Sequence, residues 1–163
     1  MTKFISLLER ILAVFCVVLC IALVISVVWQ VFSRYVLNAP STVTDELARF
    51  LFIWVGLVGA AYGLGKKKHL AIDLLLMKLE ASPKKYAFLQ LIINLISIFF
   101  ITVIMCYGGM KLVLDTIAAG QISPVLGIQM GLVYLALPVS GFFMLIFSAR
   151  DLFAELRQLS AQN

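Results

Sequence analysis

Three charged residues stand at the start of a long apolar stretch, at spacings that allow them to pair. Asp45 and Glu46 precede Arg49 by four and three residues, so all three side chains would share one face of a helix. The acids would also stabilise the positive end of the helix dipole. Arg34 ends the preceding apolar stretch and is expected at the same end of the molecule. It could therefore join these residues in a tie between two helices, or bind a partner.

A second group of charged residues follows the same apolar stretch. His69 and Asp73 are four residues apart and could form a proton relay. They also fall on the polar side of a short amphipathic segment at about residues 70–80, which is too short to cross a membrane and would lie along its surface. We favour this membrane-surface role for the whole group, which comprises Lys66, Lys67, Lys68, His69 and Asp73.

The sequence predicts neither a metal site nor a cofactor site. Cys16 and Cys20 are one helical turn apart, but no third ligand is near them, and Cys106 lies in a different apolar stretch. Buried thiols in such stretches usually pack as small apolar groups. His69 is the only histidine, so a di-haem protein, which needs paired axial histidines, is excluded.

The composition indicates a membrane protein. Of the 163 residues, 63% are hydrophobic and only 13% are charged, which leaves too few polar side chains to cover a water-soluble domain. A helix needs about 20 apolar residues to cross a membrane, and four stretches are long enough. We therefore predict an all-α fold with one membrane domain, residues 1–163, and four tilted transmembrane helices. They are expected at about 11–31, 47–64, 86–107 and 127–147.

The distribution of basic residues predicts the orientation of these helices. Ten of the thirteen Lys and Arg residues lie before the first stretch, between the second and third, or after the fourth. Because positively charged loops stay in the cytoplasm, both termini are expected there, and the connections 33–46 and 109–126 on the other side. The first stretch is too long for a cleaved signal peptide and is expected to remain as an anchor. The net charge of +5 then serves lipid headgroups rather than nucleic acid.

Glycines recur on the second and fourth predicted helices at intervals that permit close helix contacts. The neighbouring helix could belong to the same chain or to a partner subunit. Two threonines, Thr42 and Thr44, are candidates for the N-cap of the second helix, and Pro138 is expected to kink the fourth. The packing glycines are Gly56, Gly59, Gly63, Gly127 and Gly131.

The four apolar stretches contain one charged residue, Arg49, which lies near an end. Pathways for ions and solutes are marked by ionisable groups at membrane depth, so these helices suit a scaffold better than a conduit. A self-sufficient homo-oligomeric transporter or channel is the alternative, but small four-helix exporters of that kind carry a membrane-embedded Glu, which this chain lacks. An enzyme is not expected, because no nucleophile or metal ligand set accompanies the charged cluster.

Three motifs occur in a distinctive order along the chain. They are the Asp45-Glu46-Leu47-Ala48-Arg49 start, the His69-x-x-x-Asp73 exit, and the run from Ser123-Pro124 to Tyr134-x-x-x-Pro138. Together they resemble the small membrane subunit (DctQ-like) of tripartite ATP-independent periplasmic (TRAP) transporters.

This resemblance implies a function within a larger complex in the bacterial inner membrane. The large membrane subunit would carry the organic acid, such as a dicarboxylate or sialic acid, together with sodium. A periplasmic substrate-binding protein would deliver the substrate, and this chain would support the large subunit, binding lipids but no cofactor of its own. The outer connections could help to dock the binding protein, in which case charge reversal at Asp45 or Glu46 should weaken uptake without preventing membrane insertion.

Overall fold

The computed structural model describes residues 2–66 and 83–161. Lys66 is therefore the only described member of the predicted membrane-surface group. The expected amphipathic segment at 70–80, with the neighbouring Lys67, Lys68 and His69, lies outside the described residues.

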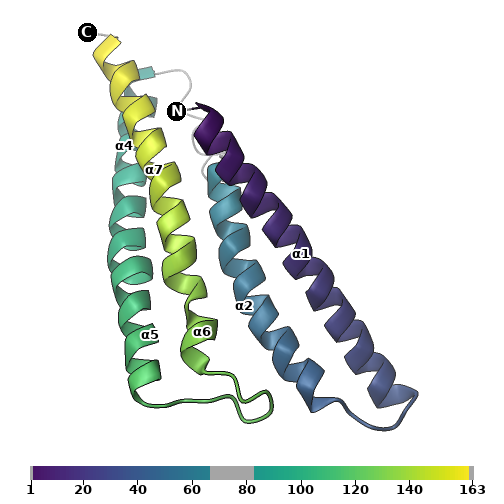
Figure 1. Cartoon of the computed structure of the whole chain (residues 1–163). Helices are drawn as coiled ribbons and strands as arrows, with labels where there is room; N and C mark the ends of the chain where they lie inside the picture. Colours follow the sequence, from purple (N-terminus) through teal and green to yellow (C-terminus); the bar gives the residue numbers. More distant parts are fainter. Residues whose placement is uncertain (1, 67–82, 162–163) are drawn as a thin grey trace.

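Within these two ranges the chain is helical, without a β-strand (Figure 1). The helices are α1 (Thr2–Tyr35), α2 (Thr42–Gly65), α4 (Pro83–Phe100), η1 (Ile101–Gly108), α5 (Gly109–Ala118), α6 (Met130–Tyr134) and α7 (Ala136–Ala161). Four helical segments are long and apolar enough to cross a membrane, namely Ile5–Tyr35, Thr42–Gly65, Leu89–Ala118 and Met130–Ala154. The prediction of four membrane-spanning helices is thus confirmed. Each observed helix extends past its predicted apolar stretch at one end or at both.

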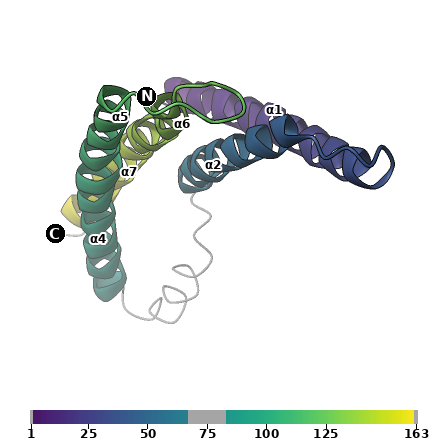
Figure 2. The same ribbon diagram turned by 90° about the horizontal axis from the view of Figure 1, so that it is seen from below.

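Helix α7 lies at the centre of the arrangement. It packs against α2 on one side and against α4 and η1 on the other, while α1 packs mainly on α2. Seen along the bundle, the helices form an open arc rather than a closed four-helix bundle (Figure 2). Both termini lie at one end, and the two described connections, 36–41 and 119–129, lie at the opposite end (Figure 1). We call these the terminal end and the loop end.

Two small apolar clusters hold the helices together, and most other large apolar side chains are exposed, as expected for a chain surrounded by lipid or by a partner. The first cluster joins α1, α2 and α7, and the second joins α2, η1 and α7. Their buried members are Ile5, Leu12, Val58 and Phe147 in the first, and Ala61, Ile101, Met105 and Met144 in the second.

The third membrane-spanning helix contains a π-helical segment in its middle. Helices α4, η1 and α5 follow one another without interruption, and η1 is the π-helical part. Glycines on both sides allow η1 and α5 to approach α7 closely. A Cβ atom at Gly109 would lie 2.9 Å from Leu137 Cβ, and one at Gly141 would lie 3.0 Å from Met105 Cβ. The apolar pattern of this stretch did not predict a π-helix.

The fourth membrane-spanning helix is interrupted at Leu135, between α6 and α7. Pro138 has no amide hydrogen to donate to the carbonyl of Tyr134, four residues earlier. Regular hydrogen bonding continues on both sides, from the Leu135 amide to Gly131 O at 3.0 Å and from the Val139 amide to Leu135 O at 3.1 Å. The expected effect of the proline is therefore seen as a one-residue interruption of the helix, three residues before Pro138.

The glycines that make close contacts are largely different from those expected. Among the described residues, a Cβ at Gly56, Gly59 or Gly63 would meet nothing within 4 Å, so these three do not pack closely against another described helix. Gly127 has a φ of +65°, so its role is to form a turn. Of the expected set, Gly131 alone is in close contact, with Ile117. The other close contacts involve Gly65, Gly109 and Gly141.

Candidate functional site

The N-terminus of α2 is capped by Ser41 rather than by a threonine. Ser41 has an extended conformation, and its hydroxyl accepts a hydrogen bond from the Thr44 amide at 3.4 Å. The Thr44 hydroxyl donates back to the Ser41 carbonyl at 3.1 Å. The prediction of Thr42 or Thr44 as the cap was wrong, because the helix begins immediately after Ser41. The Ser41 amide also donates to Ser33 Oγ at 3.3 Å, which ties the cap to α1.

Asp45 links α2 to α1. Its Oδ2 atom accepts a hydrogen bond from Arg49 Nη2 at 2.8 Å, so the expected ion pair between these two residues is present. Its Oδ1 atom accepts from Gln30 Nε2 at 2.6 Å. The tie between the two helices is therefore made by Gln30. Within the described part of the chain, the exposed Arg34 forms no ion pair with Asp45 or Glu46.

Glu46 binds the connection between the third and fourth membrane-spanning helices rather than Arg49. Its Oε2 atom accepts hydrogen bonds from Ser123 Oγ at 2.8 Å, from the Val125 amide at 3.1 Å and from the Leu126 amide at 2.8 Å. Hydrogen bonds to a carboxylate are stronger than those between neutral groups. Residues 77 to 80 positions apart are thus held together by one carboxylate oxygen, a contact that the local sequence pattern did not indicate.

The connection that Glu46 binds is itself a compact loop. An isolated β-bridge joins Ile122 to Gln129, and the Ser123 amide donates to the Ile128 carbonyl at 2.8 Å. Gly127, with its positive φ, completes the turn by donating its amide to the Ser123 carbonyl at 3.1 Å. We refer to residues 121–129 as the clasped loop.

A substitution at Gln30 tests the tie between α1 and α2. Gln30→Met keeps the length of the side chain but removes the hydrogen bond to Asp45, and we expect a loss of about 1 kcal/mol in local stability. Amide hydrogen exchange at residues 33–37 should accelerate about fivefold to tenfold, whereas Gln121→Met, at an exposed position of the clasped loop, should leave that segment unchanged. Equal protection in the two variants would show that the Gln30–Asp45 bond does not hold the end of α1.

At the terminal end, Glu9 joins three helices. Its carboxylate pairs with Lys66 Nζ at 2.7 Å, just after α2, and with Arg150 Nη1 of α7 at 3.2 Å. Arg150 also pairs with Asp151 at 2.8 Å and donates to the Gly65 carbonyl at 3.1 Å, at the end of α2. Glu9 was not among the predicted site residues, and Lys66, assigned to the membrane surface, is an ion-pair partner here.

The Glu9–Lys66 pair affects the titration of the lysine. The hydrogen bond from Lys66 to the Glu9 carboxylate raises the pKa of Lys66 above its usual value. The contribution that the charged lysine makes to stability is therefore complete below the ordinary lysine pKa of about 10.4 and is lost as the pH rises through the raised pKa. The pair should stay intact throughout the physiological pH range.

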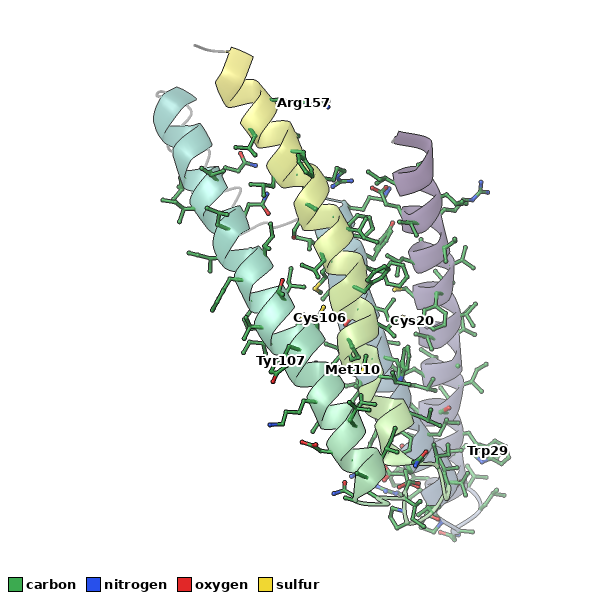
Figure 3. The ribbon with its side chains drawn as sticks, turned by 60° about the vertical axis from the view of Figure 1, so that its left-hand side comes forward. Cys20, Trp29, Cys106, Tyr107, Met110 and Arg157 are labelled. Carbon is green, nitrogen blue, oxygen red and sulfur yellow. The ribbon has the colours of Figure 1, made fainter. Side chains whose placement is uncertain are left out.

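Between the two ends, the buried hydroxyl groups mostly donate hydrogen bonds to backbone carbonyl oxygens of their own helices. Ser26 donates to Ala22 O at 2.8 Å, and Ser140 donates to Ala136 O at 2.6 Å. Figure 3 shows Cys20 and Cys106 in the middle of the bundle, with Trp29 near the loop end of α1 and Arg157 near the terminal end of α7. The three cysteines are free, and the described residues contain no group of three or more His, Cys, Asp or Glu side chains that could hold a metal ion.

The fold, the contacts of Asp45 and Glu46 at the loop end and those of Glu9 at the terminal end define a multi-pass helical membrane protein. Its ionic contacts are concentrated at the two ends of the described bundle. The chain belongs to the family described as "Tripartite ATP-independent periplasmic transporters, DctQ component", whose family model matches residues 23–158. The resemblance inferred from the sequence motifs is therefore confirmed.

Individual relatives agree with this assignment. The chain is similar to the sialic acid TRAP transporter small permease protein SiaQ of Vibrio cholerae, with 30% identity over 139 residues, which cover 85% of this chain and 77% of SiaQ. It is also similar to the C4-dicarboxylate TRAP transporter small permease protein DctQ of Rhodobacter capsulatus, with 38% identity over 100 residues. That match covers 61% of this chain and 43% of the relative, less than half of its length.

A third relative contains the similar region as part of a longer protein. The sialic acid TRAP transporter permease protein SiaT of Haemophilus influenzae is 30% identical over 118 residues. These residues cover 71% of this chain but only 18% of SiaT. A region similar to this chain therefore occurs within a much larger permease polypeptide.

Proposed function

We propose that this chain is the small permease subunit of a TRAP-type secondary transporter and that it supports the large, sodium-coupled subunit. The complex would take up an organic acid across the bacterial inner membrane. The names of the relatives, which include sialic acid and C4-dicarboxylate transporters, support this substrate class.

The observation that carries the proposal is the open face of α2. Arg49, Gly56 and Gly63 recur at seven-residue intervals and share one side of the helix, with Gly59 between the two glycines. The glycines meet nothing within 4 Å among the described residues, and the Arg49 side chain is 74% exposed. Small residues in membrane helices allow close approach of another helix, and the exposed Arg49, near the loop end of the same face, is a charged group that a partner can bind. A protein partner would account for both features.

The large permease subunit is the partner that we assign to this face. In SiaT of H. influenzae, the region similar to this chain accounts for only 18% of a protein that is itself named a permease. The isethionate TRAP transporter permease protein DctMQ of Oleidesulfovibrio alaskensis is 24% identical over 149 residues, which make up 23% of its length. In these two relatives, the region similar to this chain and the rest of the permease are joined in one polypeptide. This supports a permanent association between the small subunit and the large subunit.

A static supporting role agrees with the distribution of charge. Asp45 and Glu46 fix contacts at the loop end, and Glu9 fixes contacts at the terminal end. The middle of the described bundle has serine hydroxyls that bond to their own helices rather than ionisable groups that could bind a solute. We therefore assign substrate and sodium to the large subunit, and neither a cofactor nor an enzymatic reaction to this chain.

The orientation and the remaining partners complete the proposal. Both termini would lie in the cytoplasm, next to an in-plane amphipathic helix at about 70–80 that contacts membrane lipids. The loop end would face the periplasm, where the substrate-binding protein would dock. No nucleic acid is expected among the partners.

Purification of the tagged chain from its native membrane in mild detergent, followed by mass spectrometry, tests this proposal. We expect a large polytopic permease in about equal amount. Gly59→Leu should reduce its recovery about tenfold or more, because a bulky residue blocks close approach of the two helices. Cys20→Leu adds bulk at an exposed position of α1 and should retain the partner. Recovery of this chain alone, as a homo-oligomer, would instead favour a self-sufficient transporter or channel.

A further inference from the structure

We propose that residues 109–134 form a hinged hairpin, which rotates as one unit about η1 and Leu135, and that Glu46 is the latch that holds it against α2. The hairpin comprises α5, the connection 119–129 and α6. This inference goes beyond the proposed function and does not depend on it, because it concerns this chain alone. The other described helices remain a static support, and the hairpin is the part that moves.

The hairpin is joined to the rest of the chain by two interrupted helices. On one side, α4 reaches α5 through the π-helical η1, where the Gly109 amide bonds to the Ile104 carbonyl, five residues earlier. π-Helical segments are rare and occur frequently at functional sites. On the other side, Leu135 separates α6 from α7, and Pro138 offers the Tyr134 carbonyl no amide donor (Figure 1). Both connections to the hairpin therefore depart from a regular α-helix.

The two interruptions lie at the same depth and face each other. A Cβ at Gly109 would lie 2.9 Å from Leu137 Cβ, and one at Gly141 would lie 3.0 Å from Cys106 Sγ. The end of η1 is thus in close contact with the start of α7, and Cys106 lies in the middle of the bundle (Figure 3). Two bends at different depths would oppose a rotation, whereas two bends at one depth provide a single axis for it.

The hairpin is held together by its own contacts. The Gln121 amide donates to the Thr116 carbonyl at 3.3 Å, and the Met130 amide donates to the Gln121 carbonyl at 2.9 Å. Helix α5 packs mainly on α6 rather than on α7, with Ile117 directly against Gly131. The hairpin can therefore rotate without breaking the contacts among its own residues.

Glu46 is the latch because of the place at which it binds. Among the described residues, every hydrogen bond between the hairpin and α1 or α2 is accepted by Glu46 Oε2, at 2.8 to 3.1 Å. The donors belong to the clasped loop, at the end of the hairpin opposite to the hinge, where a rotation produces the largest displacement. The 10 residues of α5 extend about 15 Å, so a rotation of about 15° moves this end by about 4 Å. Hydrogen bonds do not persist through such a displacement.

Double electron–electron resonance on the full chain in lipid nanodiscs tests the hinge. Spin labels attached through p-acetylphenylalanine leave the native cysteines unchanged. The hairpin pair places labels at Ala118, the last residue of α5, and at the exposed Phe52 of α2. The reference pair places labels at Phe52 and at the exposed Ile96 of α4. We expect one distance for each pair while Glu46 is in place.

Glu46→Ala should give the hairpin pair a second distance that differs by about 3 Å or more, and should increase the population of that state about tenfold or more, because a carboxylate with three donors is lost. The reference pair should not change. Asp115→Asn, which removes an exposed acid of α5, is the matched control and should change neither pair. Adding Pro138→Ala to Glu46→Ala restores an amide donor for the Tyr134 carbonyl and should reduce the second population about fivefold.

Three results would overturn the inference. An unchanged hairpin distance in Glu46→Ala would mean that packing alone holds the hairpin in place. A new distance in the reference pair as well would mean that the whole bundle has loosened. A second population that Pro138→Ala leaves unchanged would show that the rotation does not occur about Leu135. Each of these results leaves the proposed function to its own test, which is the recovery of the large permease.

Discussion

Gly109→Leu will disrupt the contact between the third and fourth membrane-spanning helices, whereas Gly108→Leu, one residue earlier, will be tolerated. A Cβ at Gly109 would lie 2.9 Å from Leu137 Cβ, 3.2 Å from Pro138 Cδ and 3.3 Å from Pro138 N. These are backbone-linked atoms that cannot rotate away, so α7 itself must shift. We expect a loss of about 3 kcal/mol, at the upper end of the usual cost of overpacking.

Gly108 is a matched control because it has the same residue type in the same helix. A Cβ there would lie 3.4 Å from the Val103 carbonyl oxygen, which is an ordinary contact. Thermal unfolding of the two purified variants in the same detergent provides the comparison. Equal midpoints would show that α7 can move away from α5 at little cost, contrary to the central position that we assign to it.

Glu9→Gln will loosen the terminal end of the bundle. The Glu9 side chain is only 16% exposed and pairs with both Lys66 and Arg150. Its loss leaves the Arg150 guanidinium, which is mostly buried, without one of its two carboxylate partners. Breaking a buried ion pair by removing one partner costs about 3–5 kcal/mol, but the Lys66 side chain is 41% exposed, so we expect a smaller loss of about 2 kcal/mol.

The control for Glu9 is its neighbour on the same helix. Arg10→Gln also removes one charge near the terminal end, but the arginine is exposed, and we expect a change within about 0.5 kcal/mol. Chemical unfolding monitored by tryptophan fluorescence can compare the two, because Trp54 packs against the cluster that joins α1, α2 and α7. If both variants unfold at the same denaturant concentration, the Glu9 ion pairs do not stabilise the junction of the three helices.

The glycines show why their spacing in the sequence could not predict which of them contact another helix of the described chain. Gly56, Gly59 and Gly63 have the small-residue pattern typical of close helix contacts, yet nothing within the described chain approaches them. Gly109 and Gly141 belong to no such pattern in the sequence, and they permit the closest approach of α5 and η1 to α7. Whether a glycine is in contact depends on where two helix axes cross, and periodicity within one helix does not contain that information.

Contacts between residues close in the sequence could be predicted, and distant ones could not. The four apolar helices follow from composition, because backbone groups in hydrocarbon must be paired within the segment. The Asp45–Arg49 pair follows from a spacing of four residues. The partners of Glu46 and Glu9 lie 57 to 141 residues away, and only the packing of the helices against one another brings them together. The sequence by itself thus determined the membrane-spanning helices and the family, because hydropathy and short motifs are local properties. The tertiary structure alone decided which charges tie the helices together, since those distances depend on how the helices cross.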